Sequence, residues 1–203
     1  MIKDHYYRKA KRERYRSRAA YKLKQLNKKF RIVKQRDAVL DLGAAPGGWT
    51  QVLRDLVGAK GFVLGVDLQD MRPFKFENVR FIKGDFARDD IIDEIKGIIP
   101  RVDAVVSDAS PDISGVWDID HFRSVELSRN ALSIAGEILK PGGTFLIKIF
   151  QGSETEDFFR EVKDTFSYAR RAKPKASRDQ SSEIYIVAKG FRVSQRKTQP
   201  THE

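Results

Sequence analysis

The segment Asp41-Leu-Gly-Ala-Ala-Pro-Gly-Gly-Trp49 is the most informative part of this chain about its fold. It overlaps the end of a short apolar run, Ala38–Leu42, and leads into an expected helix over about residues 48–57. A strand, a glycine-rich turn and a helix in this order are typical of open α/β sheets, whose ligands bind at the carboxyl ends of the strands. Glycines in the turn let the backbone approach a ligand closely. The segment therefore predicts a ligand site directly after the first strand.

Short apolar runs alternate with helical segments along the rest of the chain. We expect strands at 38–42, 61–67, 79–82, 102–107, 144–150, about 168–173 and about 184–189. We expect helices at about 17–30, 48–57, 89–98, 120–139 and 154–166, the first of them capped by Ser17. This alternation predicts an α/β protein with a doubly wound, seven-stranded sheet covered on both faces. Because no helix separates the last two strands, one of them is expected to run antiparallel.

The composition excludes several classes of protein. A chain of 203 residues with 40% hydrophobic residues fits one folded domain. It has no cysteine, which excludes a disulfide framework and a thiolate zinc site, and its three histidines lack metal-ligand spacing, so we expect no metal. No apolar run approaches the length of a membrane span, and no secretory signal is recognisable. We expect a cytoplasmic protein that does not contact membranes.

The positive charge is segregated along the chain. The formal net charge is +11, yet residues 1–36 alone hold 15 Lys/Arg against 2 Asp/Glu. A second basic cluster, residues 163–197, holds 10 against 3, and the middle of the chain is acidic. Two basic regions far apart in sequence favour a polyanionic partner such as nucleic acid, although a solvated basic tail without a partner is the alternative.

The turn after the first strand is better suited to a nucleoside than to a dinucleotide. A dinucleotide fingerprint reads G-x-G-x-x-G, whereas Gly43–Gly48 reads G-A-A-P-G-G, and its proline removes an N–H donor that a pyrophosphate would need. Asp67 ends the second strand and can accept hydrogen bonds from both ribose hydroxyls of an adenosine. Asp85 follows the third strand and can accept a hydrogen bond from the adenine amino group, while Phe86 packs on the ring. The alternative for Asp85 is a helix N-cap.

Several charged residues lie within or next to the predicted apolar strands, near the same edge of the sheet. Asp108 follows the fourth strand, and Lys148 lies inside the apolar run Thr144–Phe150. Burying an ammonium group is costly unless it is paired. The alternative is a lysine whose stem lets its head reach water. Glu183 precedes the last strand, and Lys22 lies on the first predicted helix.

With these residues in place, the chain resembles the FtsJ/RrmJ family of ribose 2′-O-methyltransferases. The matching segments occur in the family's order from residue 16 to residue 188, which is nearly the whole domain. They are Arg16-Ser-Arg-Ala-Ala-Tyr-Lys-Leu23, Asp41–Trp49, Gly65-Val-Asp67, Gly84-Asp-Phe86, Ser107-Asp108, Leu146-Ile-Lys-Ile-Phe-Gln-Gly152 and Ser182-Glu-Ile-Tyr-Ile-Val-Ala188. One departure is visible, since the family often has Asp-Met-Ala-Pro where this chain has Asp108-Ala-Ser-Pro111.

The resemblance implies a Rossmann-like fold of the methyltransferase type, S-adenosylmethionine as cofactor, and an RNA ribose 2′-hydroxyl as acceptor. A uridine of large-subunit (23S) ribosomal RNA, free or in the ribosomal subunit, is the first expectation, and a tRNA ribose is the second. It implies a catalytic tetrad and a set of cofactor-binding residues. The tetrad is Lys22, Asp108, Lys148 and Glu183, and the cofactor-binding residues are Gly47, Trp49, Asp67, Asp85 and Asp108.

We accordingly expect a monomer with a methyltransferase domain at residues 16–191, a flexible basic extension at 1–15 and a flexible tail at 192–203. The arginines and lysines of the extension would hold RNA phosphates. Its tyrosines, Tyr6, Tyr7 and Tyr15, would either stack on bases or pack locally. Lys148 would act on the acceptor hydroxyl either as a general base or as a group that orients it.

Two other functions remain to be weighed. A non-catalytic RNA-binding factor for ribosome assembly could use the same fold, because fold alone does not establish activity. The presence of all four tetrad residues disfavours it. A nicotinamide-dependent oxidoreductase is disfavoured by the proline in the turn and by the lysine in the apolar strand.

Overall fold

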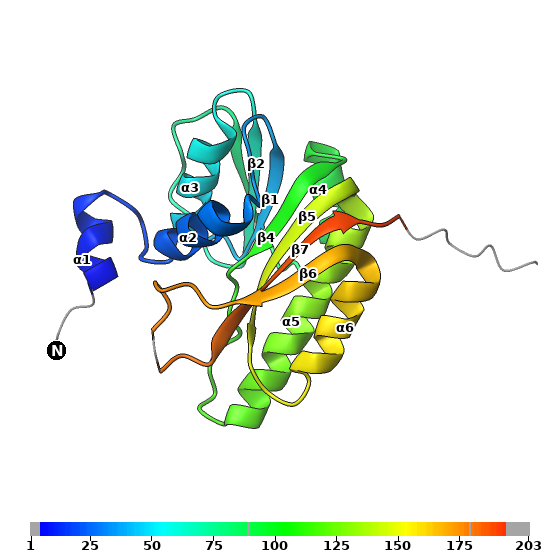
Figure 1. The fold of residues 1–203 in the computed structure, drawn as a ribbon. Helices are drawn as coiled ribbons and strands as arrows, with labels where there is room; N and C mark the ends of the chain where they lie inside the picture. The colour runs from blue at the N-terminus through cyan, green and yellow to red at the C-terminus, as the bar shows by residue number, and fades with distance from the viewer. Residues whose placement is uncertain (1–4, 89, 179, 194–203) are drawn as a thin grey trace, which may run out of the picture.

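A computed structural model describes residues 5–88, 90–178 and 180–193, which form a sheet covered by helices on both faces (Figure 1). The strands are β1 (Ala38–Leu42), β2 (Phe62–Asp67), β3 (Val79–Lys83), β4 (Val102–Ser107), β5 (Leu139–Phe150), β6 (Phe166–Ala172) and β7 (Glu183–Phe191). The helices are α1 (His5–Arg12), α2 (Ala20–Phe30), α3 (Gly48–Val57), α4 (Ile91–Ile98), α5 (Trp117–Ile138) and α6 (Thr155–Thr165). None of the helices in this described part is long and apolar enough to cross a membrane.

The strand order across the sheet is β3-β2-β1-β4-β5-β7-β6. Strands β1 to β5 pair in parallel, whereas β7 pairs antiparallel with both β5 and β6. The seven-stranded doubly wound sheet and the antiparallel end predicted from the sequence are confirmed. Because the order runs outward from the neighbouring strands β1 and β4, the switch point of the sheet lies between their carboxyl ends.

Successive side chains of the central strands pack alternately into two separate apolar clusters, one on each face of the sheet. Val39 packs on one face with α2 and α3, and its neighbour Leu40 packs on the other face with α4, α5 and α6. Both side chains are fully buried. This arrangement explains why the strands read as continuous apolar runs, since a parallel strand needs apolar residues on both faces.

Helix α2 buries one apolar face, whose residues Ala20, Leu23, Leu26 and Phe30 follow one another at steps of three or four and all lie in the core. The predicted cap is wrong, however, because the helix begins at Ala20 and has no side-chain cap. Ser17 is used in packing instead. A β-carbon placed on Gly48 would lie 2.1 Å from the Ser17 hydroxyl, so Ser17 is pressed against the start of α3.

The sequence predicted no regular structure before residue 16, and the structure corrects this for residues 5–12, which form α1. The helix buries Ala10 in a small cluster with Tyr21 of α2 and Ala176 of the β6–β7 loop. Its partners are distant in the chain, which is why local apolar periodicity did not reveal it. Residues 1–4, and 194–203 of the predicted tail, lie outside the described residues.

The other differences concern boundaries. Strand β5 begins at Leu139, directly after α5, whereas the strand was expected to begin at residue 144. The Lys140–Gly143 stretch is therefore part of the strand. Residue Val102 of β4 pairs with Leu139, and the register shifts before Ala104 pairs with Thr144. The remaining elements lie within a few residues of their predicted bounds.

Candidate active site

A cavity of about 280 Å³ opens at the carboxyl ends of β1, β2, β3 and β4. These strands are parallel, so the loops that follow them meet at one edge of the sheet. Three of the predicted site residues, Asp67, Asp85 and Asp108, line this cavity. The full lining comprises Gly43, Ala45, Asp67, Leu68, Gln69, Asp85, Phe86, Asp108, Ala109, Ser110, Asp112 and Leu127.

Two glycines of the turn after β1 are required by its geometry. Gly43 has φ +73°, and a β-carbon there would lie 2.5 Å from that of Ala109 in the loop after β4. Gly47 has φ +104°, and a β-carbon there would lie 2.8 Å from the Arg16 guanidinium. Any side chain at either position would be strained and would push the neighbouring segment away. The turn is thereby held closely between the segment that precedes α2 and the loop after β4.

Asp67 is fixed at the cavity by two backbone N–H groups. Its carboxylate accepts hydrogen bonds from the N–H of Ala45 at 2.8 Å and from that of Gln69 at 2.8 Å. One bond on each oxygen leaves further lone pairs for a ligand. Since Asp67 already occupies the Ala45 N–H of the glycine-rich turn, the turn has fewer free donors for a phosphate, which agrees with a nucleoside site.

Asp85 and Phe86 form the wall of the cavity after β3. The Asp85 carboxylate accepts a hydrogen bond from the N–H of Ala87 at 2.8 Å, and Phe86 is nearly buried. Helix α4 begins only at Ile91. The alternative that Asp85 caps this helix is therefore excluded, and its carboxylate remains beside the cavity.

Trp49 and Gly47 are not among the residues that line the cavity. The Trp49 side chain is 3% exposed, and its Nε1–H donates to the carbonyl of Ala19 at 2.9 Å. Its ring stacks on Tyr185 of β7, with centroids 6.0 Å apart. The structure therefore places this side chain in the core beneath α2, and a cofactor contact by Trp49 or Gly47 stays a prediction of the resemblance.

The four predicted tetrad residues come together from four elements. Nζ of Lys22 (α2) lies 2.6 Å from Oε1 of Glu183 (β7) and 3.9 Å from Oδ1 of Asp108. Asp108 lies in the loop after β4, and Nζ of Lys148 (β5) lies 3.4 Å from the same Asp108 oxygen. Their side chains are only 5–14% exposed, so the two cations and two carboxylates form a compact, largely dehydrated cluster.

Lys148 does not extend to bulk water. Its Nζ donates to the Asp108 carbonyl at 2.7 Å and to the Ser110 hydroxyl at 2.5 Å, in addition to its ion pair. The alternative in which the stem carries the ammonium out to solvent is excluded, because this side chain is 5% exposed. The buried amine is stabilised by polar partners on the side of the cavity.

Tyr185 is a member of the cluster that the sequence did not single out. Its hydroxyl donates to Oδ1 of Asp108 at 2.6 Å. Burial, followed by the nearby charge of Asp108, raises the pKa of this hydroxyl well above its ordinary value. Tyr185 lies two residues after Glu183 on one strand, so the two side chains share a face. This spacing was the signal that could have found it.

The charge balance keeps Glu183 ionised. Burial alone would raise the pKa of Glu183, but attraction to Lys22 and the hydrogen bond from it outweigh this effect and hold the pKa below its ordinary value. The positive charge of Lys22 is therefore compensated within the cluster.

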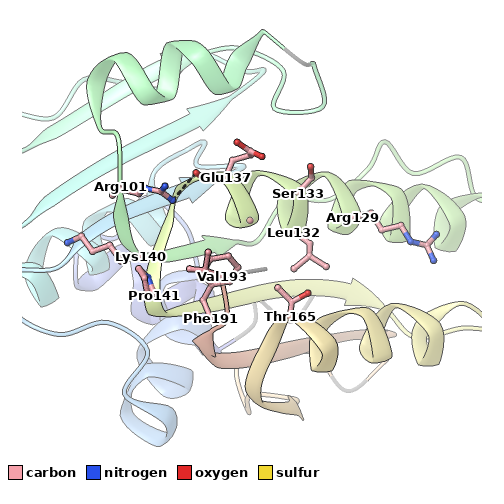
Figure 2. Close-up of a pocket in the computed structure, with 11 residues that line it drawn as sticks. Arg101, Arg129, Leu132, Ser133, Glu137, Lys140, Pro141, Thr165, Phe191 and Val193 are labelled. Carbon is pink, nitrogen blue, oxygen red and sulfur yellow. Dashed lines mark hydrogen bonds between the residues drawn. The ribbon is translucent and has the colours of Figure 1, made fainter. Parts of the chain in front are cut away.

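A larger cavity of about 950 Å³ lies at the opposite edge of the sheet, around the start of β5 and the ends of α5 and α6 (Figure 2). Its three basic side chains, Arg101, Arg129 and Lys140, are each hydrogen-bonded to a carboxylate or a backbone carbonyl. None of the predicted site residues lines it. We place the functional site at the smaller cavity, because that is where the titratable groups converge.

Comparison with known proteins finds similarity over nearly the whole chain. The model of the family described as FtsJ-like methyltransferase matches residues 15–191. The ribosomal RNA large subunit methyltransferase E of Archaeoglobus fulgidus is 52% identical over 189 residues, covering 93% of this chain and 96% of the relative. That of Methanocaldococcus jannaschii is 51% identical over 193 residues, covering 93% and 79%.

Solved structures extend the similarity. A putative ribosomal RNA methyltransferase from Plasmodium falciparum has 33% sequence identity and a TM-score of 0.79, covering 87% of this chain and 98% of that chain. The fibrillarin pre-rRNA processing protein of Methanococcus jannaschii has 18% identity and a TM-score of 0.55, covering 79% of this chain and 69% of that chain. The second likeness concerns the fold alone.

Proposed function

Because the chain belongs to the FtsJ-like methyltransferase family, we propose that it transfers the methyl group of S-adenosylmethionine to a ribose 2′-hydroxyl of large-subunit ribosomal RNA, most simply that of a uridine. The observation that carries the proposal is the buried cluster of Lys22, Asp108, Lys148 and Glu183. It adjoins a cavity whose carboxylates suit a nucleoside.

The residues of the cavity fit the proposed cofactor. The Asp67 carboxylate would accept hydrogen bonds from the ribose hydroxyls, and the Asp85 carboxylate would accept one from the adenine amino group, with Leu68 and Phe86 as apolar walls. Asp108 would lie toward the reacting end, because it also contacts Lys148. When bound, S-adenosylmethionine supplies an activated methyl group on a sulfonium ion, so positioning provides much of the acceleration.

The cluster would act on the acceptor. A ribose hydroxyl must lose its proton as its oxygen attacks the methyl carbon, and Nζ of Lys148 is the group available near the cavity. A neutral amine would take the proton as a general base, whereas an ammonium would only direct the oxygen lone pair. The Asp108 carbonyl accepts a hydrogen bond from Nζ of Lys148 and helps to hold the amine in either case. The pair of Lys22 and Glu183 adjoins the same carboxylate and closes that side of the cluster.

Ribosomal RNA is preferred over tRNA as the substrate because the relatives above are named as ribosomal RNA methyltransferases. A basic surface next to the cluster supports an RNA substrate. Helix α1 contains Arg8, Lys9, Lys11 and Arg12 and lies beside α2, which carries Lys22 (Figure 1). A non-catalytic assembly factor would not need the complete tetrad, so we retain that function only as an outcome of the test.

The test is methyl transfer from labelled S-adenosylmethionine to ribosomal subunits, free ribosomal RNA and tRNA, with the labelled nucleotide mapped by its resistance to alkali. We expect label in an alkali-resistant dinucleotide from large-subunit RNA, because a 2′-O-methyl group blocks cleavage of the adjacent phosphodiester. Cofactor binding without transfer to any of these RNAs would contradict the proposal and favour the assembly factor.

Replacing Asp67 with asparagine is expected to weaken binding of S-adenosylhomocysteine, measured by calorimetry, about 10- to 100-fold, because hydrogen bonds to a charged acceptor are replaced by weaker ones. Asparagine retains one oxygen acceptor for the backbone of the turn. The matched control is Asp70→Asn, since Asp70 is exposed, pairs with Lys83 and does not line the cavity. Equal affinities in the two variants would remove Asp67 from the cofactor site.

Charge on α1 is expected to govern RNA affinity. Two of its exposed cations, Arg8 and Lys11, are suited to substitution by glutamine because the packing of α1 depends on Ala10 and Tyr6 instead. We expect the double variant to bind ribosomal RNA more weakly and to lower the slope of log K against log salt by roughly 1.5, since each phosphate that the protein no longer neutralises lowers it by about 0.7–0.9.

The control for this experiment removes two charges elsewhere. Lys60 lies in the turn between α3 and β2, and Lys140 lies near the start of β5. Both are exposed, lie toward the other edge of the sheet and belong to neither basic cluster. The Lys60→Gln, Lys140→Gln variant should keep the wild-type slope. If both double variants change the slope equally, α1 is not a specific RNA contact.

The packing of the N-terminal tyrosines bears on which of them would stack on an RNA base. The Tyr6 and Tyr15 rings lie 5.4 Å and 5.6 Å from that of Tyr21, so these two pack locally. Tyr7 is 41% exposed and is the most exposed of the three tyrosines, so a base would reach its ring most readily.

A further inference from the structure

Lys148 is held at the cavity by a residue that lies outside the tetrad. Its Nζ has three polar neighbours, namely the Ser110 hydroxyl at 2.5 Å, the Asp108 carbonyl at 2.7 Å and Oδ1 of Asp108 at 3.4 Å. Ser110 thus provides the shortest of these contacts. It is exposed and lines the cavity, whereas Lys148 is nearly buried.

The Asp108 carboxylate holds the amine only loosely, because its Oδ1 atom is shared. The Tyr185 hydroxyl donates to this oxygen at 2.6 Å, and Nζ of Lys22 lies 3.9 Å from it. At 3.4 Å, Nζ of Lys148 is beyond the usual length of an N–H···O bond to a carboxylate. The direction in which this amine points therefore depends mainly on the Ser110 hydroxyl and the Asp108 carbonyl.

We propose that Ser110 is a positioning residue that directs Nζ of Lys148 toward the acceptor hydroxyl in the cavity. A lysine side chain has four rotatable bonds, and confining its head to one direction costs conformational entropy that fixed polar partners offset. This inference rests on the proposed function, since it assigns a step of methyl transfer to Lys148.

A hydroxyl is suited to this task in either protonation state of the amine. It accepts a hydrogen bond from an ammonium N–H, and by rotating it can instead donate to the lone pair of a neutral amine. The Asp108 carbonyl can only accept. Ser110 therefore keeps contact with Lys148 whether the lysine serves as a general base or as an orienting ammonium, and a methyl group in its place could do neither.

The experiment compares Ser110→Thr with Ser110→Val, two side chains of nearly the same shape that differ by one hydroxyl. Residue 110 is exposed, so neither substitution is expected to disturb the fold. Steady-state kinetics with ribosomal RNA or subunits would give kcat and the KM for S-adenosylmethionine. We expect the valine variant to lose about tenfold in kcat relative to the threonine variant, as for one hydrogen bond to a charged group, with the KM for S-adenosylmethionine unchanged.

Each outcome has a distinct meaning. Equal kcat values for the threonine and valine variants, whether high or low, would overturn the positioning role, because the hydroxyl would then be irrelevant. A loss confined to KM would overturn it too and would make Ser110 a cofactor contact. Failure of the proposed function is distinguishable from both, since the wild-type protein would then transfer no methyl group to RNA.

Discussion

Replacing Lys148 with alanine is expected to lower kcat for methyl transfer by roughly 10²- to 10⁴-fold, the usual contribution of a group that handles a proton in the transition state. Binding of S-adenosylmethionine should remain nearly intact, because Lys148 does not line the cavity and Asp67 and Asp85 are untouched. The fold should persist as well. Asp108 keeps its hydrogen bond from Tyr185, and Glu183 keeps its ion pair with Lys22.

The same strand offers a matched control. Lys140 is exposed at the other end of β5, where it pairs with Asp103. Lys140→Ala removes one lysine from β5 without touching the cluster and should leave kcat at the wild-type value. The measurements are kcat by label transfer, cofactor affinity by calorimetry and the melting temperature of each variant. Loss of cofactor affinity in Lys148→Ala would contradict the assignment, as would undiminished transfer.

A second large effect is expected in stability, at Asp41 of β1. This side chain is fully buried, and Oδ2 accepts a hydrogen bond from the Thr50 hydroxyl at 2.7 Å. Within the described residues, Oδ1 has no hydrogen-bond partner. Burial, supported by the nearby charges of Asp108 and Asp67, raises the pKa of Asp41 to about 7, against an ordinary value of 3.8.

The direction of the pH dependence follows from proton binding. Between about pH 4 and pH 7 the folded protein keeps the Asp41 proton, whereas the unfolded chain has released it. The unfolded state then binds fewer protons, so the contribution of Asp41 to the free energy of unfolding falls as the pH rises. It levels off above pH 7. The total loss is about 4 kcal/mol, at 1.36 kcal/mol for each unit of pKa difference.

Asp41→Asn should abolish this contribution, because an amide does not titrate. Urea unfolding of both proteins at several pH values between 5 and 8 would measure it. The difference in unfolding free energy between wild type and variant should change by roughly 3 kcal/mol across that range, with the variant gaining relative stability at high pH. Groups that titrate in both proteins cancel in this difference.

The control is Asp55→Asn on α3, which changes an exposed carboxylate. It should leave the pH dependence of the wild type unchanged. If the free energy of unfolding depends on pH in the same way for wild type and Asp41→Asn, Asp41 is ionised in the folded protein at neutral pH. The proposed burial of a protonated carboxyl would then be wrong.

The fold could be predicted from local patterns because most of its information is local. Apolar runs alternating with helical segments defined six of the seven strands of the described part of the chain to within a few residues, along with the helices that cover them. The glycine-rich turn predicted a ligand site at the edge of the sheet where the smaller cavity lies. Strand β5 is the exception at its beginning. Leu139 pairs with Val102 of β4, and the local sequence Lys140-Pro-Gly-Gly143 does not predict that pairing.

Helix α1 and the true start of α2 could not be predicted for a related reason. The apolar contacts of α1 are Tyr21 and Ala176, which the chain brings to it from different elements. Ser17 has the chemistry of a cap, yet the close approach of Gly48 engages it in packing. In both places a tertiary contact overrides a local preference.

The order of residues along the chain was enough to establish the α/β class and the segregated charge. It was also enough to predict a ligand edge and, through its motifs, the four residues of the proposed tetrad. Which atoms meet depends on the packing of the elements. Lys22, Asp108, Lys148 and Glu183 lie on separate elements, and their distances depend on how α2, β4, β5 and β7 pack. The same packing brought Tyr185 and Ser110 to the cluster and moved the Trp49 ring away from the cavity. Spacing along a chain fixes which face of one element a side chain occupies, whereas contact between elements depends on their relative placement, which spacing does not contain.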